Sequence, residues 1–327
     1  MLEALTIYAQ RFSKLVADRV PLRYPVATLR RAPHKSLLLL AVLDLFAEGR
    51  VASNLIELNP DLGETFTLYW AKVMPPDQRG NIALPFFHLR SSGFWHLLPR
   101  PNMETVLAAS KQIKSIGQLQ GAVLGARLDE DLYALLRVRE TREQLRAVLI
   151  GAYFAPDFQP ALAEQGVING EAFLYSQKLL QQAREIQEVL VDVERYKPVA
   201  RDQGFRRAVI TAYNHHCAMC SLRVLTPDGH TAADAAHIVP WSKTYDDRVV
   251  NGMALCRLCH WGFDEGMLGV SAKYSVMTSP QLEAEHNKPL HLVALKGRRL
   301  SLPVERHFWP ELDGLETHQK ETFQRRK

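Results

Sequence analysis

All four cysteines of this 327-residue chain fall into two Cys-x-x-Cys pairs near its carboxyl end. The first pair is Cys217 and Cys220, in "CAMC". The second is Cys256 and Cys259, and His260 follows it directly. In a reducing compartment, thiolate pairs at this spacing suggest metal ligands before disulfides, because they fit the corners of a tetrahedral zinc site. We therefore expect one structural Zn²⁺ ion bound by the four cysteines.

The segment between the two pairs, "ADAAHIVPWSKTYDDRVVNGMALC", adds polar residues in the order His237, Asn251 and then His260. A strand ending at His237, a turn, and a helix beginning near Asn251 and carrying His260 would bring these side chains to one side of a small unit. Such a unit is too small to be stable by apolar burial alone, so the zinc would supply what its core lacks. The histidines are then free for chemistry.

These residues resemble the HNH endonucleases, which have a ββα-metal fold, in the subgroup braced by two Cys-x-x-Cys knuckles. The resemblance covers about Phe205 to Ser279 and rests on the first knuckle, "AAHIVPW", "NGMALC" and "CxxCHxxFD". It implies that His237 is the general base that activates water, and that Asn251 positions this histidine or its loop. It also implies that His260 helps to bind a catalytic Mg²⁺ or Mn²⁺ ion.

One position departs from that family's pattern. Many relatives have an acidic metal ligand immediately before the base, but Ala236 stands there in this chain. The carboxylate for the catalytic metal is therefore expected from Asp234 or from Asp264. The competing interpretation of the whole segment is a zinc-ribbon-like binding module without activity, against which the set of His237, Asn251 and His260 argues.

Two stretches stand out in the amino-terminal half. In "RRAPHKSLLLLAVLDLFAEGR", His34 and Lys35 lie at the start of a strongly apolar helix, where free backbone N–H groups and the helix dipole favour an anion. In "NIALPFFHLRSSGFWHLLPRP", Pro85 to Phe87 are expected to interrupt a strand and form an apolar corner beside His88. An apolar pocket with basic neighbours suits an atom that is less hydrated than a phosphate oxygen.

These stretches resemble the DNA-sulfur-binding domains of restriction enzymes that act on phosphorothioate-modified DNA. The resemblance covers roughly Leu2 to Ala155 and rests on "PHKSLLLLA" and on the pair "LPFFHL" and "GFWHL". It implies that His34 and Lys35 contact the DNA backbone or a base edge near the modified step. It also implies a sulfur cavity lined by Leu84, Pro85 and His88. Relatives often have tyrosine before the proline and a small residue three places after it, so Leu84 and His88 are departures.

The pattern as a whole predicts an α+β protein with three parts: a recognition domain at 1–155, a helical linker at 156–200 and an HNH domain with structural zinc at 201–327. Strand-like pieces such as "ETFTLYW" and "GFWHLL" alternate with helical stretches in the first part. The linker, after a loop "APDFQPALAEQGVING", has an apolar stripe that either packs against its own domain or forms a spacer or dimer contact: Leu179, Ala183, Ile186, Leu190 and Val193.

Composition and charge limit the expected partners and location of the protein. The chain is 47% hydrophobic and has a formal net charge of +5, which is compatible with a polyanionic partner. The amino terminus does not have the pattern of a signal peptide, and no apolar run approaches the length of a membrane span, so we expect a cytoplasmic protein with no membrane partner.

The prediction is therefore a modification-dependent restriction endonuclease that recognises phosphorothioate-modified double-stranded DNA and hydrolyses phosphodiester bonds nearby. A single HNH site cuts one strand, so a double-strand break needs a homodimer or successive nicks. The alternatives are an HNH endonuclease directed by methylated cytosine and a non-cleaving, zinc-containing DNA-binding regulator. Direction by methylated cytosine would ordinarily need a base-flipping pocket with aromatic stacking, which the sequence does not reveal.

Overall fold

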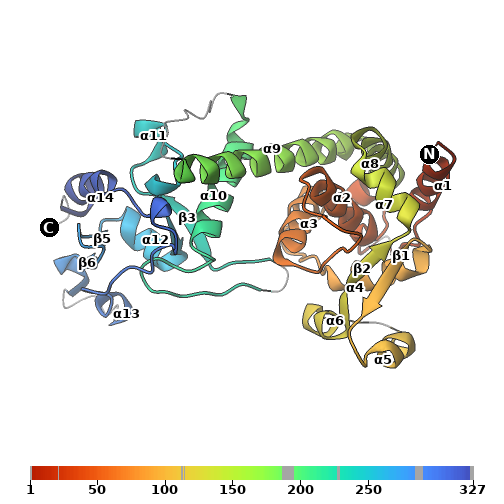
Figure 1. The fold of residues 1–327 in the computed structure, drawn as a ribbon, viewed down its shortest axis with the longest axis horizontal. Coiled ribbons are helices and arrows are strands. Elements are labelled where there is room, and N and C mark those ends of the chain that lie inside the picture. The colour runs from red at the N-terminus through yellow and green to blue at the C-terminus, as the bar shows by residue number, and fades with distance from the viewer. Residues whose placement is uncertain are drawn as a thin grey trace. The chain divides into compact units, whose positions relative to one another are not determined.

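The computed structural model describes residues 2–20, 22–111, 113, 115–185, 195–226, 229–283 and 290–324 (Figure 1). The chain divides into two compact units. The first contains Met1–Gly170 and Thr226–His230, and the second contains Glu171–Leu225 and Thr231–Lys327. Each unit has its own hydrophobic core. The expected mixed helix and strand class is confirmed.

The first unit is mainly helical and contains one antiparallel strand pair. Its strands are β1 (Trp95–Pro99) and β2 (Val123–Leu128). Its helices are α1 (Leu2–Ser13), α2 (His34–Ala47), α3 (Pro60–Val73), α4 (Ala83–His88), α5 (Glu104–Ala109), α6 (Ile116–Ala122), α7 (Glu130–Arg137) and α8 (Arg139–Tyr153). Helix α9 (Gln159–Arg184) begins in this unit and ends in the second.

Helix α2 is the centre of the first core because its sequence is apolar on every side. Every residue from Leu37 to Leu43 is at most 2% exposed. A helix that is hydrophobic all round must be covered on all sides, and α3, α4, α7 and α8 pack against it. Burial of each leucine side chain contributes about 1.5–3 kcal/mol. The amino terminus of α2, where His34 and Lys35 lie, is therefore fixed by a rigid core.

A buried carboxylate on α2 ties this helix to three others. Asp44 lies 2.7 Å from the Arg146 guanidinium of α8, and it accepts hydrogen bonds from Tyr69 of α3 and Asn169 of α9. Burial raises the pKa of Asp44, and Arg146 opposes that shift. Because a buried charge is tolerated only when it is paired and hydrogen-bonded, this set specifies how the helices pack around α2.

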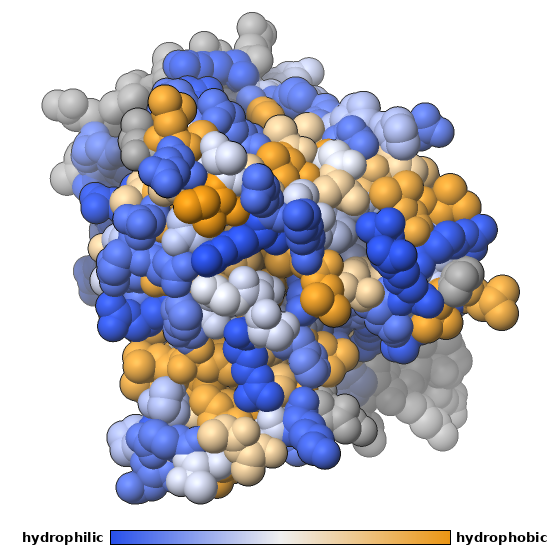
Figure 2. All heavy atoms as spheres, turned by 90° about the vertical axis from the view of Figure 1, so that its right-hand side faces the viewer, coloured by the Kyte–Doolittle hydropathy of each residue, from blue (hydrophilic) through white to orange (hydrophobic). Residues whose placement is uncertain are grey.

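The face of the molecule shown in Figure 2 is mostly hydrophilic, and its apolar residues gather in patches between the polar ones. Exposed apolar side chains of the first unit include Val16 and Leu22, which precede α2. Single exposed apolar residues are common on folded proteins. No helix in the described ranges combines the length and apolarity needed to cross a membrane.

The second unit is built around a strand pair followed directly by a helix. The strands β3 (Ala233–His237) and β4 (Gly252–Cys256) are antiparallel, with Ala233 opposite Cys256 and His237 opposite Gly252. Helix α12 (Arg257–Asp264) continues from β4 and packs against both strands, which gives the expected ββα arrangement. The other helices and strands are α10 (Pro198–Ala212), α11 (Trp241–Thr244), β5 (Leu268–Val270), β6 (Val276–Thr278), α13 (Leu290–Val293) and α14 (Leu312–His318).

The first residue of β4 must be a glycine because α10 approaches the strand closely. A Cβ atom built on Gly252 would lie 2.5 Å from Val209 Cγ2 and 3.0 Å from Phe205 Cζ. Any side chain there would push α10 away from the strand pair. The glycine that follows Asn251 therefore allows Phe205 to reach the end of β3.

Several sequence-based element assignments were wrong. The piece "ETFTLYW" belongs to helix α3, whose buried residues recur at helical spacing: Leu62, Phe66, Tyr69, Trp70 and Val73. Aromatic and β-branched residues suggested a strand there, but the period of burial decides. The segment Leu84 to Phe87 lies in helix α4, where Pro85 is tolerated in the first turn because N–H groups there lack intrahelical partners.

Two boundaries also differ from expectation. The segment 155–170 is mostly helical, because α9 begins at Gln159. The helix expected to begin near Asn251 begins at Arg257, and Asn251 instead ends a 3₁₀ turn (Val249–Asn251) before β4.

In the apolar stripe predicted for the linker, Leu179 is buried. Three of its members lie outside the described residues: Ile186, Leu190 and Val193.

Candidate functional site

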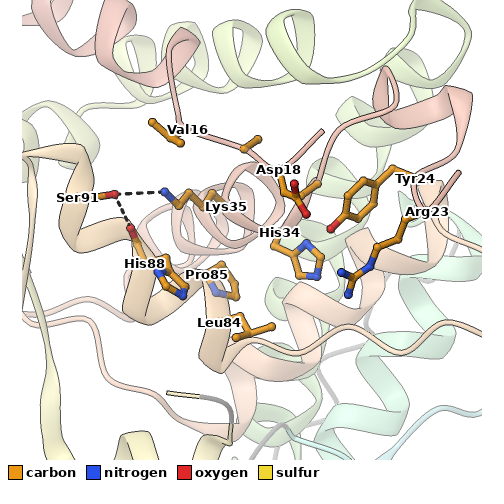
Figure 3. Close-up of a pocket in the computed structure, with 12 residues that line it drawn as sticks. Val16, Asp18, Arg23, Tyr24, His34, Lys35, Leu84, Pro85, His88 and Ser91 are labelled. Atoms are coloured by element: carbon orange, nitrogen blue, oxygen red, sulfur yellow. Dashed lines mark hydrogen bonds between the residues drawn. The ribbon is translucent and has the colours of Figure 1, made fainter. Parts of the chain in front are cut away.

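A pocket of about 390 Å³ opens on the first unit, between the start of α2 and helix α4 (Figure 3). All five residues expected to bind substrate line it: His34, Lys35, Leu84, Pro85 and His88. The other lining residues precede α2 or follow α4: Val16, Ala17, Asp18, Arg23, Tyr24, Ala32 and Ser91. The structure thus brings the five residues together from two separate stretches, while their contact with DNA stays a prediction.

Helix α4 presents its pocket residues because its opposite side is anchored in the core. Phe86 and Phe87 are fully buried, and the Phe86 ring meets Trp95 edge-on at a centroid distance of 5.0 Å. Residues three and four positions apart share a helix face, so His88 lies on the same side of α4 as Pro85 and Leu84, and all three line the pocket. Leu84 and Pro85 supply an apolar wall.

His34 contributes a neutral ring to the pocket. Its imidazole packs edge-on against Trp70, at a centroid distance of 4.8 Å, and against Tyr24 at 6.3 Å. Burial lowers the pKa of His34 to about 4, with a smaller contribution from the positive charge of Arg23. At neutral pH this residue therefore offers a hydrogen bond to a ligand and carries no charge.

Lys35 supplies a positive charge at the pocket. Its Nζ lies 3.4 Å from the Ser91 hydroxyl, which in turn donates to the backbone carbonyl of His88 (Figure 3). Burial lowers the pKa of Lys35. Burial also lowers the pKa of His88, and the charges of Lys35 and Arg90 lower it further. An anion placed here would stabilise the charged forms of Lys35 and His88.

Sequence reasoning missed the wall formed by Asp18, Arg23 and Tyr24. These residues lie in the irregular stretch between α1 and α2. No periodicity or motif marks this stretch, so its side chains could be assigned to the pocket only from the fold.

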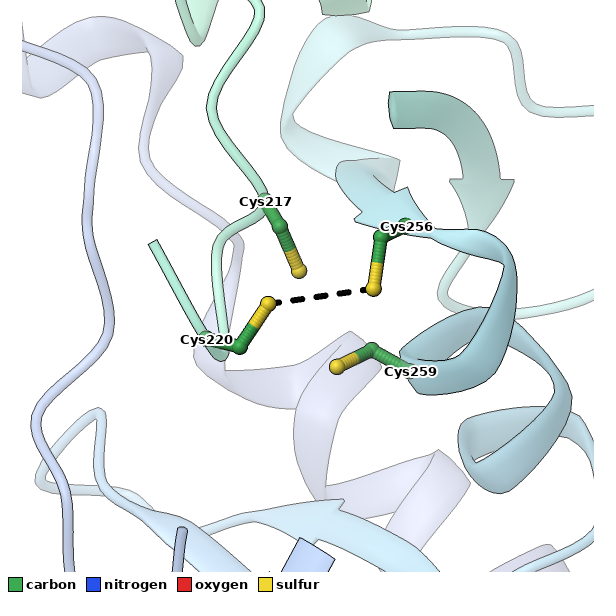
Figure 4. A group of neighbouring side chains, drawn as sticks. All are labelled: Cys217, Cys220, Cys256 and Cys259. Carbon is green, nitrogen blue, oxygen red and sulfur yellow. Dashed lines mark hydrogen bonds between the residues drawn. The ribbon is translucent and has the colours of Figure 1, made fainter. Parts of the chain in front are cut away.

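The four cysteines of the second unit converge as expected (Figure 4). Their Sγ atoms all lie within 4.8 Å of one another, and those of Cys220 and Cys256 are 3.7 Å apart. A tetrahedral site with Zn–S bonds of about 2.3 Å places its sulfur atoms about 3.8 Å apart. The donor set and spacing therefore fit a metal ion such as zinc.

Backbone hydrogen bonds hold the first knuckle against the strand pair. The N–H of Ala218 donates to the carbonyl of Ala254 in β4, over 2.7 Å. Cys256 is the last residue of β4, and Cys259 lies in the first turn of α12. The metal site is therefore built where the first knuckle, β4 and α12 meet.

His237 is the last residue of β3. One face of its ring contacts an aromatic side chain, and one edge contacts a carboxylate. The ring stacks on Phe205 of α10, with centroids 3.9 Å apart and planes 7° apart. Its Nε2 lies 2.8 Å from Oδ1 of Asp247. The side chain is still 25% exposed, so solvent can reach it.

Asn251 organises the loop that follows His237. The buried amide accepts a hydrogen bond from the Val239 N–H and donates to the carbonyls of Val239 and Asp246. Its own backbone carbonyl accepts from Ile238 N–H over 2.8 Å. All these contacts are with the segment 238–246, so Asn251 fixes this loop next to His237.

His260 on α12 is close to one of the two predicted carboxylates. Its Nε2 lies 3.4 Å from Oδ2 of Asp264, one helical turn later. Asp234 instead accepts a hydrogen bond from Arg206. The structure therefore pairs His260 with Asp264.

Within the described part of the chain, the cysteines form the only group of three or more side chains placed to bind one metal ion. His260 and Asp264 offer two ligand groups. Mg²⁺ usually keeps several waters and is held by one or two carboxylates together with substrate phosphates. A pair of protein ligands therefore fits a catalytic ion that binds together with DNA.

Two family models match different parts of the chain. Residues 13–168 match the family model described as ScoMcrA-like, DNA sulfur-binding domain, and residues 210–271 match the model of HNH endonuclease. No curated protein matches the chain. Among solved structures, a chain described as "Modification dependent TagI restriction endonuclease" is 20% identical over 36% of this chain and 37% of that chain, with a TM-score of 0.28. A TM-score this low does not indicate a shared fold.

Proposed function

We propose that this chain, which joins a DNA sulfur-binding domain to an HNH endonuclease domain, cleaves DNA in response to phosphorothioate modification. The amino-terminal domain, residues 1–155, recognises the modified phosphate, and residues 201–327 hydrolyse a phosphodiester bond nearby. The observation that carries this proposal is the pocket, where Leu84 and Pro85 form an apolar wall beside the charge of Lys35.

The pocket combines two properties that favour sulfur over oxygen. Lys35 attracts the negative charge that both kinds of phosphate carry. A sulfur atom is larger than oxygen and its charge is more diffuse, so moving it from water to the wall of Leu84 and Pro85 is less costly. His34, neutral at the base of the pocket, offers a hydrogen bond to the DNA backbone or to a base edge.

In the HNH domain, His237 acts as the general base that removes a proton from the attacking water. Asn251 fixes the adjoining loop through its three amide hydrogen bonds. His260 and Asp264 would hold a catalytic Mg²⁺ or Mn²⁺ ion, which would supply positive charge to stabilise the phosphoryl oxygen and the departing 3′ oxygen. The four cysteines would hold a structural Zn²⁺ ion, which would stabilise the folded ββα unit.

One HNH site cuts one strand of a duplex. A double-strand break by this protein therefore requires either a homodimer or two successive nicks. Nicked circular product that accumulates before linear product indicates successive cuts, whereas direct formation of linear product indicates two coordinated sites.

Matched plasmids with and without phosphorothioate test the proposal. We expect the purified protein to cleave only the modified plasmid in the presence of Mg²⁺ or Mn²⁺. The His237→Ala protein is the control for contaminating nuclease. Equal cleavage of both plasmids would contradict the role of sulfur, and preferential cleavage of a cytosine-methylated plasmid would support direction by methylated cytosine instead.

A further inference from the structure

We infer that Asp247 is a positioning residue that fixes the tautomer and orientation of His237, so that Nδ1 is the atom that accepts the proton from the attacking water. The inference rests on the proposed role of His237 as general base. Asp247 belongs to the acidic loop between β3 and β4, and no sequence motif distinguished it from Asp246 beside it.

The contact between the two side chains determines where the imidazole proton lies. Asp247 is 4% exposed, and its Oδ1 is 2.8 Å from Nε2 of His237. An ionised carboxylate only accepts hydrogen bonds, so Nε2 must carry the proton. In the neutral ring Nδ1 then has the free lone pair. Within the described ranges, Nδ1 has no hydrogen-bond partner in the protein, so it is available to a water molecule.

The second carboxylate oxygen of Asp247 also has contacts, and these prevent the carboxylate from rotating away from His237. Asp247 Oδ2 accepts a hydrogen bond from the Tyr175 hydroxyl over 2.9 Å, and Nε of Arg201 lies 3.1 Å from the same oxygen. The Arg201 guanidinium lies over the Trp241 ring, 3.7 Å from its centroid. The buried negative charge thus has an adjacent positive charge and a hydrogen-bond donor, which a buried carboxylate requires.

Phe205 supplies the remaining restraint on His237. The parallel stack at 3.9 Å prevents the imidazole from tilting, while the Asp247 contact prevents it from turning within its plane. A base held in its productive orientation before the substrate arrives loses less entropy in the transition state.

Water oxygen forms a bond to phosphorus while Nδ1 of His237 takes one of its protons, and the bond from phosphorus to the 3′ oxygen breaks. The departing oxygen leaves with the bonding electron pair and gains a proton from solvent. His237 becomes an imidazolium, which ionised Asp247 stabilises through Nε2–H without taking the proton.

Asp247→Asn tests this inference, because an amide NH₂ group facing Nε2 favours the wrong tautomer. We expect cleavage of modified DNA to fall about 10²- to 10⁴-fold, as for removal of the carboxylate from comparable triads. Binding of the modified duplex should change less than about twofold, because positioning of a base acts in the transition state. Asp313→Asn is the control for removal of a carboxylate: Asp313 is exposed in the first turn of α14, and cleavage should stay within about twofold of the wild-type protein.

Nitrogen NMR of ¹⁵N-histidine-labelled protein provides a readout that does not depend on the stability of a variant. In the neutral ring, His237 of the wild-type protein should be the Nε2–H tautomer. Its signal is identified by its loss in His237→Ala. In Asp247→Asn the Nδ1–H tautomer should gain population.

An Nδ1–H tautomer of His237 in the wild-type protein overturns the inference. So does near-normal cleavage by Asp247→Asn alongside an inactive His237→Ala protein, which leaves the proposed function intact. Cleavage that survives His237→Ala overturns the proposed function, and this inference with it.

Discussion

The Sγ atoms of Cys220 and Cys256 lie 3.7 Å apart, although 36 positions separate the two residues in the chain. Between them run β3, the loop and β4, which carry His237 and Asn251. A metal ion held by both knuckles therefore closes the segment that contains the proposed general base. Folding of this segment and binding of the metal should be one event.

Replacing Cys256 with serine should remove the metal and unfold the second unit. The wild-type protein should contain about one equivalent of zinc. In Cys256→Ser, elemental analysis should find much less, and the second unit should unfold before the first, whose transition is the internal control. A Cys256→Ser protein that keeps both its zinc and its unfolding transition would show that the cysteines are not the brace.

Replacing His237 with alanine should separate cleavage from recognition. Cleavage of modified DNA should disappear, because the general base acts in the transition state. Affinity for the modified duplex, measured by titration, should be nearly unchanged. Loss of binding together with cleavage would mean that His237 contacts DNA in the ground state or supports the fold.

Two substitutions in the pocket should have different effects on binding, measured in the His237→Ala background. Lys35→Ala should weaken binding of modified and unmodified duplexes by similar factors and should reduce the salt dependence of both by about one counterion. Pro85→Ser should abolish the preference for sulfur and leave weak nonspecific binding. The preference itself is worth a few kcal/mol at most, about what the transfer of one atom provides.

The measurement uses duplexes that differ by one sulfur atom of defined stereochemistry. Pro156→Ser is the matched control for Pro85→Ser, because Pro156 is exposed and does not line the pocket. If Pro85→Ser keeps the full preference, the apolar wall does not recognise sulfur. If Lys35→Ala weakens only the modified duplex, Lys35 contacts the sulfur itself.

The buried His34 should make the first unit less stable in acid. Its pKa is lowered by burial to about 4, whereas an unfolded histidine titrates near 6.5. As pH falls from about 6.5 to about 4, the unfolded chain gains a proton that the folded chain does not, so the unfolding free energy falls by a few kcal/mol at most.

His34→Gln should remove this contribution. The stability of the variant relative to the unmodified protein should therefore rise as pH falls through that window, while the other titrating groups cancel in the difference. Urea unfolding of the first unit at about pH 7 and about pH 4.5 provides the comparison. A difference in stability that does not change with pH would contradict the buried, neutral state of His34.

Local patterns in the sequence were sufficient for the domain types, and they named residues that the structure brings together in the pocket and in the cysteine cluster. Cysteine pairs at metal-ligand spacing, the order of His237, Asn251 and His260, and the proline before an apolar helix at His34 depend on residues close together in the chain. The matches to a DNA sulfur-binding domain and an HNH endonuclease confirm the predicted architecture. The segment "ETFTLYW" is rich in aromatic and β-branched residues, which favour a strand, but its buried residues recur at the helical period of α3.

Only the tertiary structure decided which residues contact His237 and His260 and which residues complete the pocket. Asp264 lies beside His260 because α12 places it one turn later, whereas Asp234 on β3 is hydrogen-bonded to Arg206. Arg23 and Tyr24 join the pocket from a stretch without periodicity. Asp247 and Phe205 meet His237 only because α10 and the loop before β4 pack against β3. The contacts of Phe205, and those that bring Arg23 and Tyr24 to α4, join segments that are distant in the chain, so no local spacing marks these residues.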